Sequence, residues 1–269
     1  MTLAWADAFD GDGAAPVRPL RLPEPITPEW AWGGSTGGGV KVAVVDSGID
    51  ASHPAVGSVA GGVAFELSPE GEITAAEGPH DDLYGHGTAC AGIIRSHAPD
   101  VELYSVRVLG ANLTGKGSLF AAGIRWCLDH GIAVANLSLS SRSQALKTTF
   151  HDLADEAAFR GVPLVCAANN VAAPSYPSTF ASVVSVAAIA TADHDRFLVN
   201  PSPPVEFGAP GVDIEVSWLG GATVTTTGNS FAAAQMTGHL ARLLGRHPGI
   251  TVAEAKTVLR ALAANADVG

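Results

Sequence analysis

Three short segments of this chain carry side chains that could do covalent chemistry together. They are VDSGID at residues 45–50, GHGTACAG at residues 85–92 and GNSFAA at residues 228–233. A serine hydroxyl is a weak nucleophile until an imidazole removes its proton, and a buried carboxylate fixes the imidazole tautomer and stabilises its charged form. We therefore expect Ser230, His86 and Asp46 to act as nucleophile, general base and orienting acid.

The elements around these segments explain how the three side chains could meet. Residues 40–45 form an apolar, β-prone run that ends at Asp46, so a buried parallel strand places Asp46 at its carboxyl end. Open α/β sheets place their active sites at that end. The small apolar run at residues 87–94 predicts a buried helix that begins near His86. A second small-residue helix, at about residues 230–245, begins at Ser230, where the helix dipole favours developing negative charge.

The rest of the chain alternates between strand and helix patterns. Further strands are predicted at residues 101–108, 132–139, 162–168 and 183–188 and near Val205, Ile214 and Val224, and helices at residues 119–128, 146–157 and 251–264. This alternation predicts an α/β fold with a mostly parallel central sheet and helices on both faces. The length suits one domain over residues 37–269. Closely spaced prolines make residues 1–36 an extended, Pro/Gly-rich arm without a helix.

The order Asp, His, Ser, with these small flanking residues, resembles the subtilases, the subtilisin-like serine proteases of peptidase family S8. Chymotrypsin and the α/β-hydrolases place the same side chains in other orders. The resemblance implies a three-layer subtilisin-like fold and a serine endopeptidase that cleaves extended peptides through an acyl-enzyme on Ser230. The chain also resembles subtilases that trim leader sequences from ribosomally made peptides.

The resemblance further implies an oxyanion-hole asparagine and a substrate groove. Asn170 aligns best with the asparagine, and Asn169 is the runner-up. Segments 115–119 and 136–140 resemble the two edge strands that pair with an extended peptide by β-augmentation. Ser175 stands where another pocket residue is usually glycine, so we expect a shallow, partly polar pocket for small or polar side chains. The substrate-binding residues are Gly115, Gly117, Ser118, Leu119, Ser138, Leu139, Ser140, Ala167, Ala168 and Asn169.

Departures from the family pattern leave other functions open. Asn229 stands where the family has Thr, Ala234 where it has Pro, and Asn169 where it has Gly. One alternative is an impaired subtilase that serves as a peptide-binding partner. Another is a transpeptidase or macrocyclase, which passes the acyl group to an amine. An α/β-hydrolase esterase is disfavoured, because the histidines after Ser230 lie in helical stretches.

Composition and charge limit the kinds of partner and the cellular compartment that we expect. With 15 basic and 26 acidic residues the formal charge is −11, so we expect a peptide or protein substrate and neither nucleic acid nor a membrane. Three cysteines without a CxxC pair argue against a disulfide framework or a zinc site. The first thirty residues do not follow the pattern of a secretory signal. We therefore expect a cytoplasmic protein; the oligomeric state stays open.

No cofactor or metal is expected. Residues 95–100 form a short connection where many bacterial subtilases carry a calcium loop, and Ala55 stands at the place of one acidic ligand, so we expect that calcium site to be absent. His80, Asp81 and Asp82 lack a regular ligand spacing with His86. Cys90 follows His86 by one helical turn, either as a small buried apolar residue or as a thiol open to oxidation or mercurials.

Overall fold

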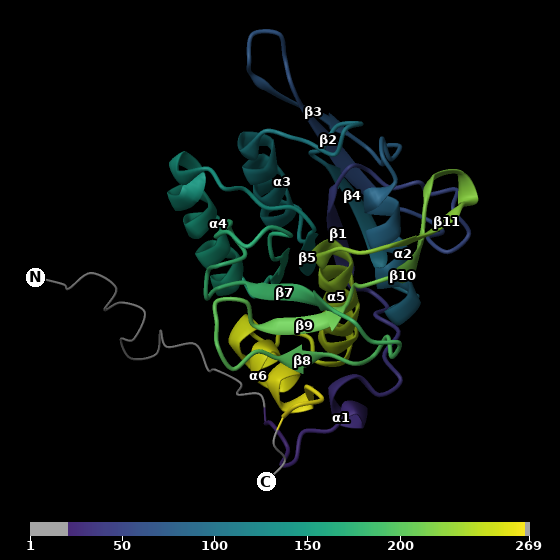
Figure 1. Ribbon diagram of the computed structural model, residues 1–269, viewed down its shortest axis with the longest axis vertical. Helices are drawn as coiled ribbons and strands as arrows, with labels where there is room; N and C mark the ends of the chain where they lie inside the picture. Colours follow the sequence, from purple (N-terminus) through teal and green to yellow (C-terminus); the bar gives the residue numbers. More distant parts are fainter. Residues whose placement is uncertain (1–20, 267–269) are drawn as a thin grey trace, which may run out of the picture.

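A nine-stranded sheet forms the middle of the computed structural model, which describes residues 21–266 (Figure 1). Its spatial order is β3-β2-β4-β1-β5-β6-β7-β9-β8, and only β3 and β8 run antiparallel to their neighbours. The predicted mostly parallel sheet is thus confirmed. Strand bounds are β1 Lys41–Asp46, β2 Gly61–Leu67, β3 Ile73–Glu77, β4 Glu102–Arg107, β5 Val134–Leu137, β6 Leu164–Ala167, β7 Val184–Ile189, β8 Leu198–Val199 and β9 Phe207–Pro210, and a separate ribbon pairs β10 Ile214–Ser217 with β11 Thr223–Thr226.

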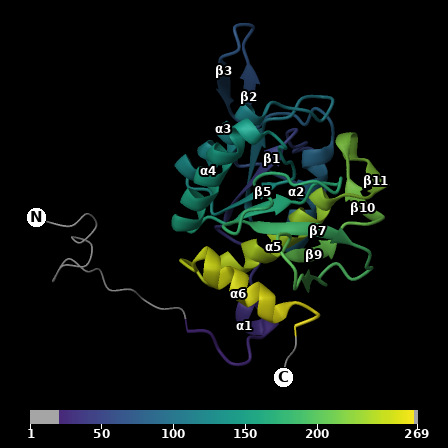
Figure 2. The same ribbon diagram turned by 60° about the vertical axis from the view of Figure 1, so that its left-hand side comes forward.

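Helices cover both faces of this sheet (Figures 1 and 2). Successive strand residues point to opposite faces, so Val42 and Val44 join a core with α2 and α5, while Ala43 and Val45 join a core with α3 and α4. Within residues 21–266 no helix is long and apolar enough to cross a membrane. Helix bounds are α1 Pro28–Trp32, α2 His86–His97, α3 Gly117–Asp129, α4 Lys147–Phe159, α5 Asn229–Arg246 and α6 Val252–Leu262.

Helices α2 and α5 lie side by side on one face and carry two of the expected catalytic side chains at their first turns. Gly238 allows the close approach, because a Cβ there would lie 2.6 Å from the Cβ of His97. Strand β1 pairs with β4 on one side and β5 on the other, so the chain order reverses beside it. The carboxyl end of β1 therefore opens into the crevice where sheets of this kind hold their active sites.

The N-terminal arm differs from its prediction. Residues 28–32 form the short helix α1, with Thr27 as its N-cap and Pro28 at the first turn, where a missing N–H costs nothing. Ala31 and Trp32 are buried in the core that contains α5. The expectation of an arm without a helix is therefore wrong for residues 28–32, and residues 1–20 lie outside the described part of the chain.

Strands β2 and β3 form a hairpin that projects from the sheet (Figure 1) and that the sequence patterns do not predict. All five residues of β3 are exposed, so the strand lacks the alternation of buried and exposed positions that marks a strand in a sequence. Most other predicted elements are present, with bounds that shift by a few residues.

Candidate active site

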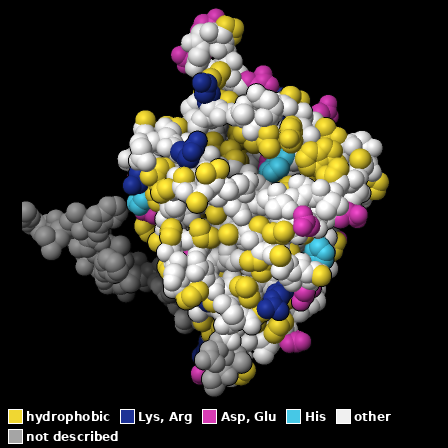
Figure 3. Space-filling model, in the orientation of Figure 1, with side chains coloured by type: hydrophobic (Ala, Val, Ile, Leu, Met, Phe, Trp, Pro, Cys, Tyr) yellow, Lys and Arg dark blue, Asp and Glu magenta, His cyan; other side chains and the backbone are white. Residues whose placement is uncertain are grey.

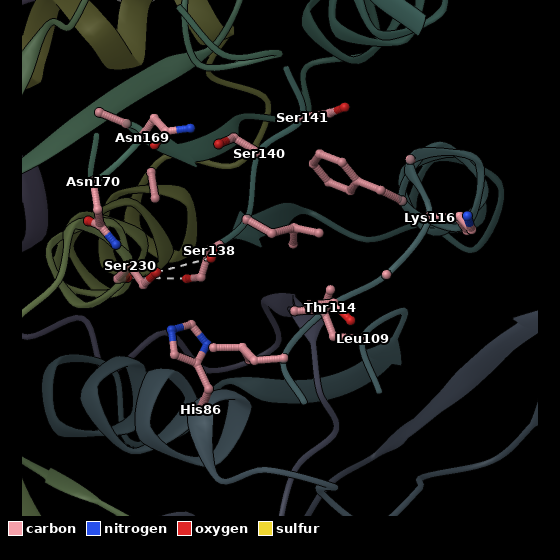
Figure 4. Close-up of a pocket in the computed structure, with 17 residues that line it drawn as sticks. His86, Leu109, Thr114, Lys116, Ser138, Ser140, Ser141, Asn169, Asn170 and Ser230 are labelled. Carbon is pink, nitrogen blue, oxygen red and sulfur yellow. Dashed lines mark hydrogen bonds between the residues drawn. The ribbon is translucent and has the colours of Figure 1, made fainter. Parts of the chain in front are cut away.

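Asp46, His86 and Ser230 come together at the carboxyl edge of the sheet. Asp46 ends β1, His86 begins α2 and Ser230 lies in the first turn of α5. His86 and Ser230 both line a cavity of about 390 Å³, and the close-up in Figure 4 shows the imidazole facing the serine across it. Three segments far apart in the sequence thus supply one site.

The carboxylate of Asp46 holds the imidazole of His86. His86 Nδ1 lies 2.8 Å from each Asp46 carboxylate oxygen, and Asp46 is fully buried. Gly87 makes this approach possible, since a Cβ there would lie 2.0 Å from the carbonyl oxygen of Gly48. The pair fixes the tautomer with hydrogen on Nδ1, so Nε2 is left as the acceptor for a proton from the cavity.

Asp82 anchors the first turn of α2. Its Oδ1 accepts from Ser47 Oγ and from the backbone N–H groups of Tyr84 and Gly85, at 2.7–2.9 Å. Its Oδ2 accepts from the N–H and the hydroxyl of Thr88, at 2.8 and 2.6 Å. A carboxylate at a helix N-terminus is favoured by the helix dipole. Asp82 therefore fixes the backbone on both sides of His86, a role that the sequence patterns do not reveal.

The electrostatic surroundings make His86 a stronger base than an exposed histidine. Burial by itself lowers the pKa of His86. The negative charge of Asp46, the hydrogen bond to Asp46 and the charge of Asp82 outweigh this, so the pKa lies above its ordinary value of 6.5. The shift favours the imidazolium that forms when His86 takes a proton.

In this structure the Ser230 hydroxyl is directed to a backbone carbonyl. Its Oγ donates to the carbonyl oxygen of Ser138 at 3.0 Å, and Ser138 Oγ donates to the carbonyl oxygen of Ser230 at 3.2 Å (Figure 4). A change of rotamer about the Cα–Cβ bond of Ser230 would turn the hydroxyl toward His86 Nε2. Hydrogen bonds of this kind tighten when a substrate binds.

Of the two asparagines after β6, the geometry favours Asn170 as the oxyanion donor. Its Oδ1 accepts from the backbone N–H of Asn229 at 3.1 Å, which leaves its NH₂ group for the cavity, and the side chain extends toward Ser230 (Figure 4). Asn169 Oδ1 instead accepts from the N–H of Val171 at 2.9 Å, so Asn169 caps its own loop.

Asn229 joins three segments around the site. Its Oδ1 accepts from the N–H of Ala188 at 2.7 Å, and its Nδ2 donates to the carbonyls of Ala168 and Asn169 at 3.1 and 3.2 Å. The family's threonine has one hydroxyl and can donate only one hydrogen bond. This departure therefore adds contacts between α5 and the wall of the cavity.

Most of the residues expected along the substrate line the cavity. These are Gly115, Gly117, Ser138, Leu139, Ser140, Ala167, Ala168 and Asn169. The expectation for Ser118 and Leu119 is wrong, because α3 begins at Gly117 and Leu119 joins the core beneath. Ser175 is buried with its Oγ 2.9 Å from Ser178 Oγ, outside this cavity.

Three apolar side chains of the cavity were not predicted, namely Leu109, Leu113 and Phe120. Leu109 and Leu113 belong to the loop that connects β4 to α3, and a loop has no periodic signal. Phe120 lies on α3, where an aromatic residue at helical spacing predicts only a core contact. The side of the cavity away from Ser230 thus combines these apolar groups with Thr114, Lys116 and Ser141 (Figure 4).

Cys90 lies behind the site. Its Sγ is 3.2 Å from Ser138 Oγ and 4.0 Å from Asp46 Oδ2, and the residue is fully buried. Burial, followed by the charge of Asp46, raises the pKa of this thiol well above its ordinary range. Cys90 is therefore a protonated thiol, as expected for a small buried residue. Cys127 and Cys166 are also free and buried.

The connection expected to lack calcium contains an arginine surrounded by carbonyls. The guanidinium of Arg95 donates to the backbone oxygens of Val56, Ser58, Pro99 and Val101 at 2.7–3.0 Å. Ala55, at the place of the expected acidic ligand, lies just before this cluster. A positive side chain thus satisfies carbonyl groups of the kind that bind a hard cation.

Comparison with known proteins agrees with this geometry. A model of the subtilase family matches residues 37–268. Subtilisin of Bacillus pumilus is 32% identical over 247 residues, which cover 86% of each chain. Subtilisin Savinase of Lederbergia lenta is 34% identical over 226 residues, 80% of each chain. Subtilisin E of Bacillus subtilis is 32% identical, and the match covers 86% of this chain and 62% of that protein.

A solved structure resembles most of this fold. The crystal structure of a cold-adapted subtilisin-like serine proteinase has a TM-score of 0.66 and 26% identity, covering 84% of this chain and 82% of its own. The family model spans most of the chain, and the subtilisins named above exceed 30% identity. The chain therefore belongs to the subtilase family of serine endopeptidases.

Proposed function

We propose that Ser230, His86 and Asp46 form the catalytic triad with which this subtilase cleaves peptide bonds. Ser230 Oγ attacks the scissile carbonyl while His86 Nε2 takes its proton, and His86 then returns the proton to the leaving amine. Water repeats these steps to release the acyl group. The observation that carries the proposal is the buried Asp46–His86 pair, with His86 Nδ1 2.8 Å from both carboxylate oxygens, whose imidazole lines the same cavity as Ser230.

Asn170 supplies the oxyanion hole together with the backbone N–H of Ser230. The Asn229 N–H holds the amide oxygen of Asn170, so the NH₂ group is directed toward the site before a substrate arrives. Donors that are fixed in advance stabilise the developing charge without reorganisation during the reaction.

The substrate is an extended peptide that lies between residues 114–117 and 138–141, which face each other across the cavity. Ser138, Ser140 and Asn169 make the pocket near Ser230 polar, so we expect cleavage after small or polar residues. Leu109, Leu113 and Phe120 would accept an apolar residue farther along the peptide. A peptide library cleaved mainly after Phe or Leu would contradict this specificity.

The cellular role that we favour is processing of peptides in the cytoplasm, including removal of leader segments. Free, buried cysteines fit a reducing compartment. Lys and Arg side chains are scattered on the face in Figure 3, and the net charge is −11, so polyanions are poor partners. Fractionation of the source cells tests the location, and recovery of the chain outside the cell would oppose it.

A fluorophosphonate probe tests the chemistry directly, because labelling needs an activated serine and a formed oxyanion hole. We expect one adduct by intact mass on the parent chain and on the control Ser202→Ala, at an exposed serine away from the cavity, and none on Ser230→Ala. Absence of labelling on the folded parent would refute the triad and favour the peptide-binding alternative. The masses of peptide products separate hydrolysis, which adds water, from cyclisation, which does not.

A further inference from the structure

A second cavity, of about 430 Å³, lies beside the carboxyl-terminal end of α2 and shares no lining residue with the active-site cavity. Strand β10, helix α5 and the connection from β7 to β8 complete its wall. Its polar lining residues include His97, His194, Asp195, Glu215 and Gln235. Nothing in the proposed peptidase mechanism uses these side chains.

Three potential metal ligands from three elements lie together at this cavity: His97 and Asp195 line it, and His239 is buried behind them. His97 of α2, His239 of α5 and Asp195 of the β7–β8 connection each place one ligand atom within 4.8 Å of the other two. His97 Nδ1 lies 3.4 Å from Asp195 Oδ1. Tetrahedral zinc with bonds of 2.0–2.2 Å requires ligand atoms about 3.4 Å apart. The Asp195 side chain is 75% exposed, so it can move the remaining distance.

The hydrogen bonding of His97 prepares one ring nitrogen for a cation. His97 Nε2 donates to Gln235 Oε1, so the neutral ring carries its lone pair on Nδ1, opposite the carboxylate of Asp195. Two acceptor atoms, His97 Nδ1 and Asp195 Oδ1, then face each other, and a cation bound between them would remove their repulsion. Metal-binding histidines commonly donate their other N–H to an oxygen in this way.

His239 offers a second neutral imidazole. The residue is 1% exposed, its Nδ1 has no hydrogen-bond partner, and its ring contacts those of His97, Trp32 and Phe197. Burial is the largest effect on both histidines, and at His97 it outweighs the hydrogen bond to Gln235 and the charge of Asp195, which raise the pKa. At His239 nearby positive charge lowers the pKa further. The pKa of each ring therefore lies below the ordinary 6.5, and the neutral form prevails at pH 7. The neutral ring is the form that binds metal. Arg242 also repels a cation, so we expect moderate affinity.

We propose that His97, Asp195 and His239 bind one zinc ion, with water as the fourth ligand. Imidazole with carboxylate suits zinc, whereas calcium and magnesium prefer sites made of oxygen. The sequence predicts no metal site, because these ligands lie on three distant segments without regular spacing.

The zinc ion would stabilise the catalytic helices without contacting a substrate. Helix α2 runs from His86 to His97, about 16 Å at 1.5 Å per residue, so the ion binds at the opposite end from the base. The ion would join α2 to α5, which carries Ser230. At a hundredfold excess of zinc over its Kd, we expect Tm to rise by about 5–10 °C.

Zinc titration of untagged Ser230→Ala protein, stripped of metal, tests the site without autolysis. We expect one zinc per chain by calorimetry, the rise in Tm, and a tetrahedral absorption band when cobalt replaces zinc. Asp195→Asn should weaken binding at least tenfold without unfolding the chain, because Asp195 is exposed. The matched control is Asp155→Asn, an exposed carboxylate 3.6 Å from His151 on α4, which should bind as the parent does.

Three results would overturn the proposal. The first is a stripped parent that binds no zinc, and the second is an Asp195→Asn variant with unchanged affinity. The third concerns the rival cluster of Asp46, His86 and Cys90 in the active site. Binding that is lost in Cys90→Ala and kept in Asp195→Asn would place the ion there.

Discussion

Replacement of Asn229 by alanine should measure how strongly the start of α5 is tied to the cavity wall. The change removes the hydrogen bonds to Ala188, Ala168 and Asn169. One such bond contributes about 1 kcal/mol net, and the site is half-buried, so three bonds give a loss of about 2–3 kcal/mol. At 2–4 °C for each kcal/mol, Tm should fall by about 4–12 °C. The Tm of Asn229→Thr should lie between those of the parent and the alanine variant, because a threonine hydroxyl can donate one hydrogen bond.

Urea unfolding followed by circular dichroism measures this loss. Every variant carries Ser230→Ala, so that unfolded chains are not digested, and the midpoint should fall with an unchanged m-value. Asn112→Ala is the control, because Asn112 binds only Thr114 within an exposed turn and should lose less than about 0.5 kcal/mol. If Asn229→Ala loses no more than this control, water replaces the three bonds and the reasoning fails.

Four further changes probe the site and its supports. Asn170→Ala should lower kcat by about 10²–10³, the loss usual for one oxyanion donor in serine proteases, and an unchanged kcat would exclude that role. The rate should fall toward acid pH with a midpoint above 6.5, because protonated His86 cannot take the serine proton. Asp82→Asn removes a negative charge that raises the pKa of His86, so the midpoint should move to lower pH. A midpoint that does not move down would count against this account. Iodoacetamide should leave all three buried thiols of the native chain unmodified by intact mass, and modify them in urea. Millimolar calcium should leave Tm unchanged by calorimetry, because Arg95 already binds the carbonyl cluster, whereas a rise would reveal a site that was not expected.

The fold could be predicted wherever a buried element requires a clear pattern of apolar residues in its sequence. Residues 40–45 are almost entirely apolar, and the corresponding strand is β1, with bounds shifted by one residue. The exposed strand β3 has no buried face and therefore no pattern. Closely spaced prolines usually exclude a helix, but Pro28 lies in the first turn of α1, where its missing N–H and fixed φ are tolerated.

The site could be predicted where its residues adjoin such patterns. His86 and Ser230 begin helices of small residues and Asp46 ends a buried strand, so the family order of the three motifs on these elements predicted that they meet. The residues that surround one position in the sequence do not show which distant segments it will contact. The partners of Asp82 and Asn229, and the approach of His97 to His239, depend on how α2, α5 and their neighbouring loops pack in three dimensions.

Arg95 occupies the position of a bound cation with a charge that belongs to the chain itself. A bound metal ion stabilises a protein only in proportion to the logarithm of its free concentration relative to Kd, so the fold loses that support in a dilute or chelating medium. The guanidinium of Arg95 is covalently attached and always charged, and its four carbonyl partners lie within reach wherever the chain is folded. The carbonyl groups at the junction between α2 and β4 therefore have a cationic partner whose presence does not depend on the concentration of any ion.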